Sequence, residues 1–241
     1  MKSRDTLPRA FLTLILLVMW VQPAGSSWPV RAVGHDGISF LARVAIASPL
    51  SGPQYRTPDL VELITLDSTI KLDIRYATAN NFLRRKMYAQ ARAFLQRPAA
   101  KALVRASARL RGLGYGLLVF DGYRPWAVTK KFWDNTPPEK KRFVANPKEG
   151  SKHNRGCAVD VSLYSFKTGK EIEMPSPYDD FTEKASSSYN GGTAAQRHTR
   201  DLLRAAMEGE GFAVNSGEWW HFDYKDWRKY GILDIPFERL K

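Results

Sequence analysis

Residues 151–160 read Ser-Lys-His-Asn-Arg-Gly-Cys-Ala-Val-Asp, and the rest of the chain is organised around this stretch. It places the imidazole of His153 and the carboxylate of Asp160 seven positions apart, and an apolar run over 158–163 begins just before the acid. We expect a loop carrying the histidine to lead into a strand carrying the aspartate. If the valines that flank Asp160 point into the core, strand alternation turns its side chain to the other face, where it can meet His153.

A catalytic zinc site usually takes three protein ligands and leaves a fourth position to water, so a further donor is needed. The chain has only four histidines. His221 is the best candidate because it lies in an aromatic segment, with a glutamate three positions before it. His35 lies in a region without a clear pattern. His198 shares a helical face with Leu202 and Ala206, which favours a partly buried helix histidine.

Glu218 precedes His221 by three positions, which suits metal-assisted hydrolysis. A zinc ion held by His153, Asp160 and His221 would lower the pKa of its water to roughly 7. Glu218 is then the natural general base for that water. Strict strand alternation would put positions 218 and 221 on opposite faces. We therefore expect a bulge or turn beside Gly217 that brings both side chains inward.

Arg124 follows a short buried strand predicted over 116–120 and is held by Pro125. A permanent cation at a fixed point could stabilise the oxyanion of a tetrahedral intermediate. A local ion pair with Asp121 explains the same residue equally well. The sequence leaves both interpretations open.

Periodicity along the rest of the chain predicts a mixture of strands and helices in one domain. A length of 241 residues with 44% hydrophobic composition is enough for the core of one domain. Besides the strand at 116–120, alternation predicts a strand over 70–76. Helical spacing, turn residues and caps predict helices over 98–110, 126–133 and 193–208.

The first 26 residues predict a secretory signal peptide. Three basic residues precede an apolar run over 10–21, and small residues follow at 24–26. The run is shorter than the ~20 residues of a membrane-spanning helix, so we expect no stable membrane insertion after cleavage. These features predict a periplasmic protein. Residues 27–56 form an N-terminal extension without an assignable pattern, and we expect residues 57–241 to form the domain that carries the zinc site.

The formal net charge of +13 favours acidic surroundings, although solubility is the simpler explanation. The chain has no run of lysines and arginines interleaved with aromatics, and export argues against contact with nucleic acid. We expect no nucleic-acid partner.

Four motifs taken together resemble the zinc D-alanyl-D-alanine dipeptidases, which include the vancomycin-resistance type and are related to D-Ala-D-Ala carboxypeptidases. The similarity spans about residues 57–237. The motifs are residues 73–78 (Asp-Ile-Arg-Tyr-Ala-Thr), 121–125 (Asp-Gly-Tyr-Arg-Pro), 151–160, and 218–222 (Glu-Trp-Trp-His-Phe).

The resemblance implies one zinc ion held by His153, Asp160 and His221. It implies that Glu218 is the general base and that Arg124 stabilises the transition state. The implied activity is hydrolysis of D-Ala-D-Ala to two D-alanines in the cell envelope.

The resemblance also implies that Tyr76 and Asp179 bind the free ammonium of the dipeptide, and that Ser151 contacts the substrate. The implied fold class is α+β, a single domain with a small central antiparallel sheet flanked by helices and a confined site.

Two other functions fit the same motifs. One is a carboxypeptidase or peptidoglycan endopeptidase that trims longer wall peptides. The other is a zinc-bearing wall-binding module without turnover, which the presence of Glu218 disfavours. Cys157, the only cysteine, occupies a small-residue position in the motif. We interpret it as a packed side chain, because a fourth protein ligand would leave no position for water.

Overall fold

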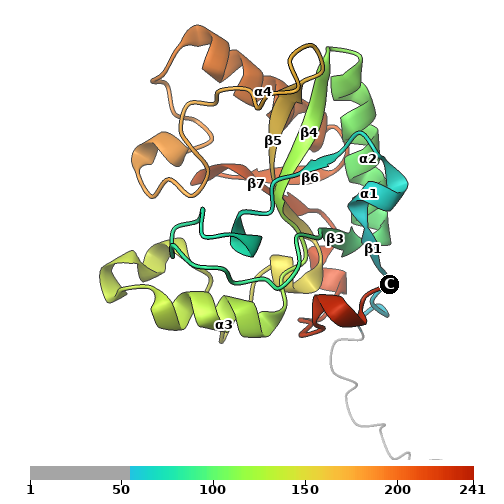
Figure 1. Ribbon diagram of the computed structural model, residues 1–241, viewed down its shortest axis with the longest axis vertical. Helices are drawn as coiled ribbons and strands as arrows, with labels where there is room; N and C mark the ends of the chain where they lie inside the picture. Colours follow the sequence, from blue (N-terminus) through green and yellow to red (C-terminus); the bar gives the residue numbers. More distant parts are fainter. Residues whose placement is uncertain (1–54) are drawn as a thin grey trace, which may run out of the picture. The chain divides into compact units, whose positions relative to one another are not determined.

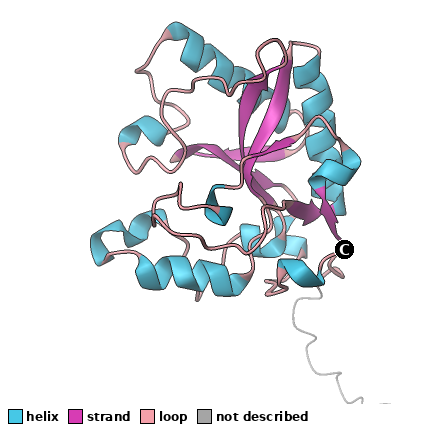
Figure 2. Cartoon of the chain, viewed as in Figure 1, coloured by secondary structure: helices cyan, strands magenta, loops and turns pink. Residues whose placement is uncertain are grey.

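The computed structural model describes residues 55–241, and these residues are organised on one five-stranded sheet (Figures 1 and 2). The predicted signal peptide and all but the end of the predicted extension lie outside the described residues. Neighbouring strands are antiparallel except β2 and β4, which are parallel, so the α+β prediction is confirmed with one parallel pair. In sheet order the strands are β2 (Lys71–Leu72), β4 (Tyr115–Asp121), β5 (Ala158–Ser165), β7 (Glu218–Tyr224) and β6 (Phe212–Asn215).

Within residues 55–241, four α-helices and a second, two-stranded antiparallel sheet accompany the main sheet. The helices are α1 (Leu63–Leu66), α2 (Arg97–Arg111), α3 (Trp126–Asn135) and α4 (Ala194–Glu208). The small sheet pairs β1 (Leu60–Glu62) with β3 (Phe94–Gln96). Short 3-10 helices lie between these elements: η1 (Arg75–Ala77), η2 (Pro138–Phe143), η3 (His153–Arg155), η4 (Glu183–Ala185), η5 (Trp227–Lys229) and η6 (Phe237–Arg239).

The strand predicted over 116–120 and the three predicted helices are confirmed as β4, α2, α3 and α4. Within residues 55–241, no helix combines the length and the apolar character that crossing a membrane would require.

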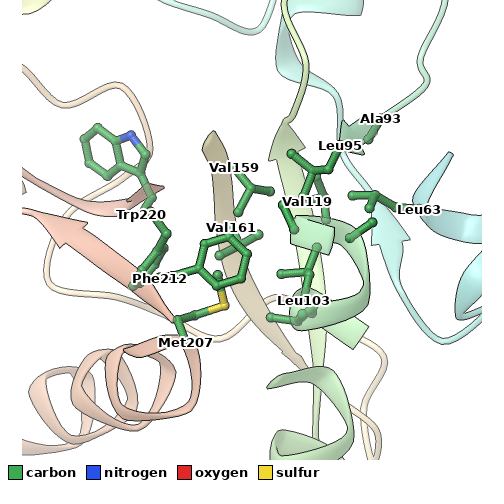
Figure 3. Close-up of a cluster of buried hydrophobic side chains, with 14 of the residues drawn as sticks. Leu63, Ala93, Leu95, Leu103, Val119, Val159, Val161, Met207, Phe212 and Trp220 are labelled. Atoms are coloured by element: carbon green, nitrogen blue, oxygen red, sulfur yellow. The ribbon is translucent and has the colours of Figure 1, made fainter. Parts of the chain in front are cut away.

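One face of β5 forms the centre of the hydrophobic core. Val159 and Val161 are fully buried, as alternation predicts. Figure 3 shows them in one cluster with Val119 of β4, Leu103 of α2 and Met207 of α4. The side chain between the two valines, that of residue 160, therefore points to the opposite face of the sheet.

Helix α4 begins with a capping box, in which the Thr193 hydroxyl accepts a hydrogen bond from the Gln196 N–H and the Gln196 side chain accepts one from the Thr193 N–H. These bonds satisfy backbone groups that the helix leaves without partners at its start. The buried stripe of α4 includes Leu203 and Met207. His198 is exposed, so the expectation of a partly buried histidine is wrong. It lies one position before the stripe, which turns its side chain towards solvent.

The strand predicted over 70–76 is wrong beyond Leu72. Ile74 is buried as alternation predicts, but the Ala77 N–H donates to the Ile74 carbonyl at 2.9 Å and closes a 3-10 turn. Local hydrogen bonds replace the strand ladder here, and Tyr76 is carried by η1 instead of a strand end. This turn buries the Tyr76 ring against Phe132 of α3.

Candidate metal centre and catalytic cavity

Three potential metal donors converge from segments far apart in the sequence. Asp160 on β5 lies directly opposite His221 on β7, and His153 lies in η3, just before β5. The His221 Nδ1 is 3.0 Å from the Asp160 Oδ1. The His153 Nε2 is 3.4 Å from the same oxygen and 3.1 Å from the His221 Nδ1. Among residues 55–241, this is the one group of His, Cys, Asp or Glu side chains close enough to hold a metal ion.

Neighbouring groups fix the orientation of both imidazole rings. The His153 Nδ1 is 2.8 Å from the Gly122 carbonyl oxygen, which can only accept, so this nitrogen carries the hydrogen. The His221 Nε2 is 2.9 Å from the Asp223 Oδ1, where it likewise donates. When each ring is neutral, its remaining nitrogen therefore presents a lone pair towards Asp160. Outer partners of this kind are typical of histidines that bind a metal.

The surroundings of the Asp160 carboxylate are those that a cation between these donors would satisfy. Its Oδ2 accepts a hydrogen bond from the Tyr178 hydroxyl at 2.9 Å. Its Oδ1 is buried and, while both rings are neutral, has no hydrogen-bond partner in the described chain. An unsatisfied buried charged oxygen is costly. Two imidazole nitrogens and one carboxylate oxygen, with room for a water, form the kind of donor set that catalytic zinc takes.

In the metal-free protein the same cluster retains a proton. Burial opposes protonation of His221, but a protonated ring would also donate to Asp160. This bond, the bond to Asp223 and the charges of Asp160 and Glu218 raise the pKa of His221 to about 10. The pKa of Asp160 is lowered, because the two histidines outweigh the effect of its burial. A divalent cation would have to displace this proton, so metal affinity should fall as the pH falls.

Glu218 lies beside the donors because the backbone of β7 is irregular. The register between β6 and β7 shifts where Val214 faces Phe222 but Asn215 faces Glu218, which confirms the irregularity predicted beside Gly217. As a result the Glu218 Oε2 lies 3.7 Å from the Nδ1 of His221. The Asn215 side-chain amide donates to that oxygen at 3.2 Å. Burial raises the pKa of Glu218.

Arg124 forms the ion pair with Asp121 that the sequence allowed and also lines the cavity, while its oxyanion role stays a prediction. Its Nη2 and Nε donate to the Asp121 Oδ2 at 2.6 and 3.0 Å, and both residues are buried. The guanidinium also lies over Phe132, 4.7 Å from the ring centroid, and lines the cavity that contains the donors. The Nη1 has no protein acceptor within the described residues. The ion pair thus orients the cation and leaves one of its nitrogens free.

Asp179 and Tyr76 meet at another part of the same cavity. The Tyr76 hydroxyl donates to the Asp179 Oδ1 at 3.0 Å, and the Phe82 N–H donates to the Oδ2 at 3.4 Å. The backbone of Asp179 has a φ of 61°, which is uncommon for a residue other than glycine. Burial raises the pKa of Asp179 to about 7, despite the hydrogen bond from Tyr76.

Ser151 and Cys157 have different surroundings. The Ser151 hydroxyl accepts a hydrogen bond from the His153 N–H at 3.2 Å and lines the cavity. Cys157 is fully buried and belongs to the hydrophobic core. Burial raises the pKa of its thiol to about 12. The interpretation of Cys157 as a packed side chain is therefore confirmed.

Residues 56–235 match a family model described as Peptidase_M15, D-Ala-D-Ala dipeptidase. The chain belongs to this family. It is thus a metallopeptidase, and the family resemblance found in the four motifs is confirmed.

Characterised relatives of this dipeptidase family align over most of their length. The D-alanyl-D-alanine dipeptidase of Escherichia coli K12 is 30% identical over 181 residues, covering 75% of this chain and 92% of the relative. The one from Enterococcus faecium is 33% identical over 178 residues, covering 65% and 87%. A solved vancomycin-resistance D,D-dipeptidase bound to a D-Ala-D-Ala phosphinate analogue covers 69% of this chain and 67% of that chain, at 19% identity and a TM-score of 0.39.

All eight site residues predicted for this family member line a single cavity of about 800 Å³. The set comprises Tyr76, Arg124, Ser151, His153, Asp160, Asp179, Glu218 and His221. The structure thus brings together every predicted site residue. Their individual roles stay predictions.

Sequence reasoning missed two residues that hold the donors in place. Asp223 accepts from His221, and Tyr178 donates to Asp160. Asp223 could have been found, because it lies two positions after His221 on the same strand and so shares its face. Tyr178 lies in a loop, where no periodic signal exists.

Proposed function

We propose that the chain is a zinc-dependent dipeptidase that hydrolyses D-Ala-D-Ala to two D-alanines in the cell envelope. The observation that carries the proposal is the buried Asp160 Oδ1, which faces one ring nitrogen from each of two oriented histidines. Within residues 55–241 this oxygen has no hydrogen-bond partner while both rings are neutral. Glu218 and Asp179 line the same cavity. A site that only bound a wall polymer would need neither of these carboxylates.

When bound, zinc would supply an activated water and polarise the scissile carbonyl. His153, Asp160 and His221 would hold the ion. Glu218 accepts the proton of the attacking water at its carboxylate and returns it to the nitrogen of the leaving D-alanine. Its raised pKa suits both directions of this transfer, and the hydrogen bond from Asn215 fixes the position of the carboxylate.

Arg124 provides the charge that complements the oxyanion. The tetrahedral intermediate carries negative charge that the ground-state carbonyl lacks, so a cation fixed in advance favours the transition state over the substrate. The ion pair with Asp121 supplies that fixation, since two of the guanidinium nitrogens are already bound. The free Nη1 is the donor that would meet the oxyanion.

Asp179 and Tyr76 select a dipeptide with a free amino group as the substrate. An ammonium group at Asp179 would form a charge-assisted hydrogen bond and keep the carboxylate ionised. An N-acylated peptide would bring a neutral amide to the same buried carboxylate and would leave its charge unpaired. This difference separates a dipeptidase from a carboxypeptidase or endopeptidase.

The enzymatic test is an assay of the purified, metal-analysed protein against D-Ala-D-Ala, L-Ala-L-Ala and N-acetyl-D-Ala-D-Ala. We expect hydrolysis of the free D,D-dipeptide alone, with one zinc ion per chain. Hydrolysis of the N-acetylated peptide would support the carboxypeptidase alternative, and absence of turnover with zinc bound would support a binding module.

The cellular location is proposed from residues 1–26 alone, whose charge and apolar pattern is that of a signal peptide. We expect the protein recovered from the cell to begin near residue 27 and to be released with the periplasmic fraction. N-terminal sequencing that finds Met1 retained would overturn this part of the proposal.

A further inference from the structure

Exposed apolar side chains gather at one end of the main sheet. Six large hydrophobic side chains are exposed within residues 55–241, and three of them belong to this end. Leu113, exposed to 57%, lies in the turn between α2 and β4. Phe166, exposed to 42%, directly follows β5, and Leu66, exposed to 37%, ends α1. Figure 1 shows the last turn of α2 and the adjoining ends of β4 and β5 together at the top of the picture.

Hydrogen bonds join the three segments that carry these side chains, which are residues 66–71, 111–115 and 164–170. The Phe166 N–H donates to the Gly114 carbonyl at 3.1 Å. The Tyr164 hydroxyl donates to the Thr69 carbonyl at 2.7 Å. The exposed apolar residues therefore come from neighbouring stretches of backbone, unlike the singly scattered apolar residues of an ordinary protein surface.

The same segments carry four basic residues and a single acid. The acid, Asp67, is buried and accepts a hydrogen bond from the Arg111 Nη2 at 2.9 Å. The other basic residues, Lys71, Lys167 and Lys170, are exposed. Within residues 55–241, no carboxylate lies within ion-pair distance of these three lysines. We call the exposed set the basic apolar patch: Leu66, Leu113, Phe166, Lys71, Lys167 and Lys170.

We propose that the basic apolar patch docks the protein on the surface of an anionic lipid bilayer. Apolar side chains at loop ends can enter the boundary between headgroups and acyl chains, while neighbouring lysines meet the lipid phosphates. A soluble polyanion would satisfy the lysines alone and leave the apolar side chains in water. A second copy of this chain would bring an identical cationic patch against the first in a symmetric dimer, and like charges would repel. A lipid surface satisfies both chemistries of the patch.

Docking at this end would keep the catalytic cavity clear of the lipid. Tyr115 pairs with Ser165 at the patch end of β4 and β5, whereas Asp121 pairs with Asp160 at the end that carries the metal donors. At ~3.4 Å per residue, the length of β4 separates the two ends by roughly 20 Å. No residue of the patch lines the cavity. The interaction therefore adds a location to the proposed function and does not depend on it.

The test is cosedimentation of the full chain with vesicles of phosphatidylglycerol and phosphatidylcholine, against vesicles of phosphatidylcholine alone. The double variant Lys167→Gln/Lys170→Gln removes charge, Leu113→Ser removes an apolar side chain, and Leu113→Trp enlarges it. The matched control is Lys130→Gln/Lys131→Gln, because both lysines are exposed and lie on α3, which follows the opposite end of β4. All variants share the N-terminus of the wild type, so the contribution of residues 1–26 to binding cancels.

We expect the wild type to bind the mixed vesicles about 10-fold or more tightly than phosphatidylcholine alone. The double variant at 167 and 170 should lose about 30-fold in affinity for the mixed vesicles, since each lysine near an anionic surface contributes a factor of about 5. Leu113→Ser should weaken binding about 10-fold, and Leu113→Trp should strengthen it. The control should bind like the wild type. Hydrolysis of soluble D-Ala-D-Ala should be equal in all of these proteins.

The inference is overturned if the wild type does not bind the mixed vesicles, or binds both kinds of vesicle equally. It is also overturned if the α3 control weakens binding as much as the double variant at 167 and 170, because the attraction would then belong to the net charge of the whole chain. Wild-type affinity in Leu113→Ser would overturn it as well, since the patch would then be a site for any polyanion.

Two further measurements accompany the vesicle assay. Sedimentation velocity that finds a dimer, disrupted by Leu113→Ser, in protein that does not bind vesicles would assign the patch to a second copy and overturn the inference. Thermal unfolding shows whether each variant folds, and if the double lysine variant does not, Leu113→Ser and Leu113→Trp decide the question. The proposed function fails separately, if vesicle binding follows the expected pattern but the wild type does not hydrolyse D-Ala-D-Ala.

Discussion

The two faces of strand β5 place very different demands on neighbouring residues. Val159 and Val161 point into the hydrophobic core, where several aliphatic side chains of similar volume could replace them. Asp160 lies between them and points to the face that carries His221, where donor type and position both matter. Substitutions on the core face should therefore change stability and leave chemistry intact. Substitutions on the site face should do the reverse.

The largest effect is expected at Glu218. Glu218→Ala should lower kcat by about 10²–10⁴-fold, because general-base catalysis is lost, while zinc content stays at one ion per chain. Steady-state kinetics and metal analysis of the same preparation check this. Glu208→Ala on α4, where the Glu208 side chain forms an exposed ion pair with Arg204, should leave kcat unchanged. Equal turnover by Glu218→Ala and wild type would remove the mechanism.

Arg124→Ala should lower kcat by about 10²–10³-fold through loss of the oxyanion partner, and zinc content should change far less. It should also reduce stability, since the buried Asp121 is left without its cation. Arg124→Lys keeps a positive charge beside Asp121. It therefore separates the loss of activity from the loss of stability. If the loss of activity in Arg124→Ala follows loss of zinc, the residue is structural.

Asp179→Asn should weaken binding of D-Ala-D-Ala by roughly 10- to 100-fold, because a charge-assisted hydrogen bond is lost. In the wild type, kcat/KM should rise as the pH rises through about 7, where Asp179 becomes ionised and able to hold an ammonium group. The variant should lack this ionisation in its pH–rate profile. A profile identical to that of the wild type would mean that Asp179 does not bind the amine.

Asp179→Asn should also change how the free energy of unfolding depends on pH. The unfolded carboxyl ionises near its ordinary pKa of 3.8, and the folded one near 7. The folded protein binds more protons between these values, so the stability from protonated Asp179 is complete below pH 3.8 and is lost as the pH rises through 7. The stability difference between Asp179→Asn and wild type should therefore shift in favour of the variant over this interval, as measured by urea unfolding.

On the core face, Val161→Ala should cost about 2 kcal/mol of unfolding free energy by removing buried methyl groups. Zinc stoichiometry and kcat should stay at wild-type values. Urea unfolding measures the first quantity, and the metal-analysed assay measures the others. A clear loss of zinc would show that the two faces of β5 are coupled.

The smallest effect is expected for Cys157→Ser. Burying a hydroxyl in place of the thiol should cost about 1 kcal/mol, and zinc stoichiometry should not change. A drop in zinc content would mean that the thiol belongs to the metal site after all.

The sequence predicted this site well where its residues belong to periodic segments. The alternation around Asp160 placed it on the face opposite the core, and the Glu-x-x-His spacing required the irregularity that β7 shows. Prediction was wrong where local hydrogen bonds compete with the pattern. Residues 70–76 alternate like a strand, yet a 3-10 turn carries Tyr76.

By itself, the sequence determined the donor types, the strand and helix segments that carry them, and membership of the dipeptidase family. Only the tertiary structure decided that Tyr76 meets Asp179, 103 positions away, and that Arg124 pairs with Asp121 while lining the cavity. The physical reason is the distance along the chain over which each kind of information acts. Periodicity reports the face of one element, whereas the partner of a side chain from a loop is fixed by how separate elements pack.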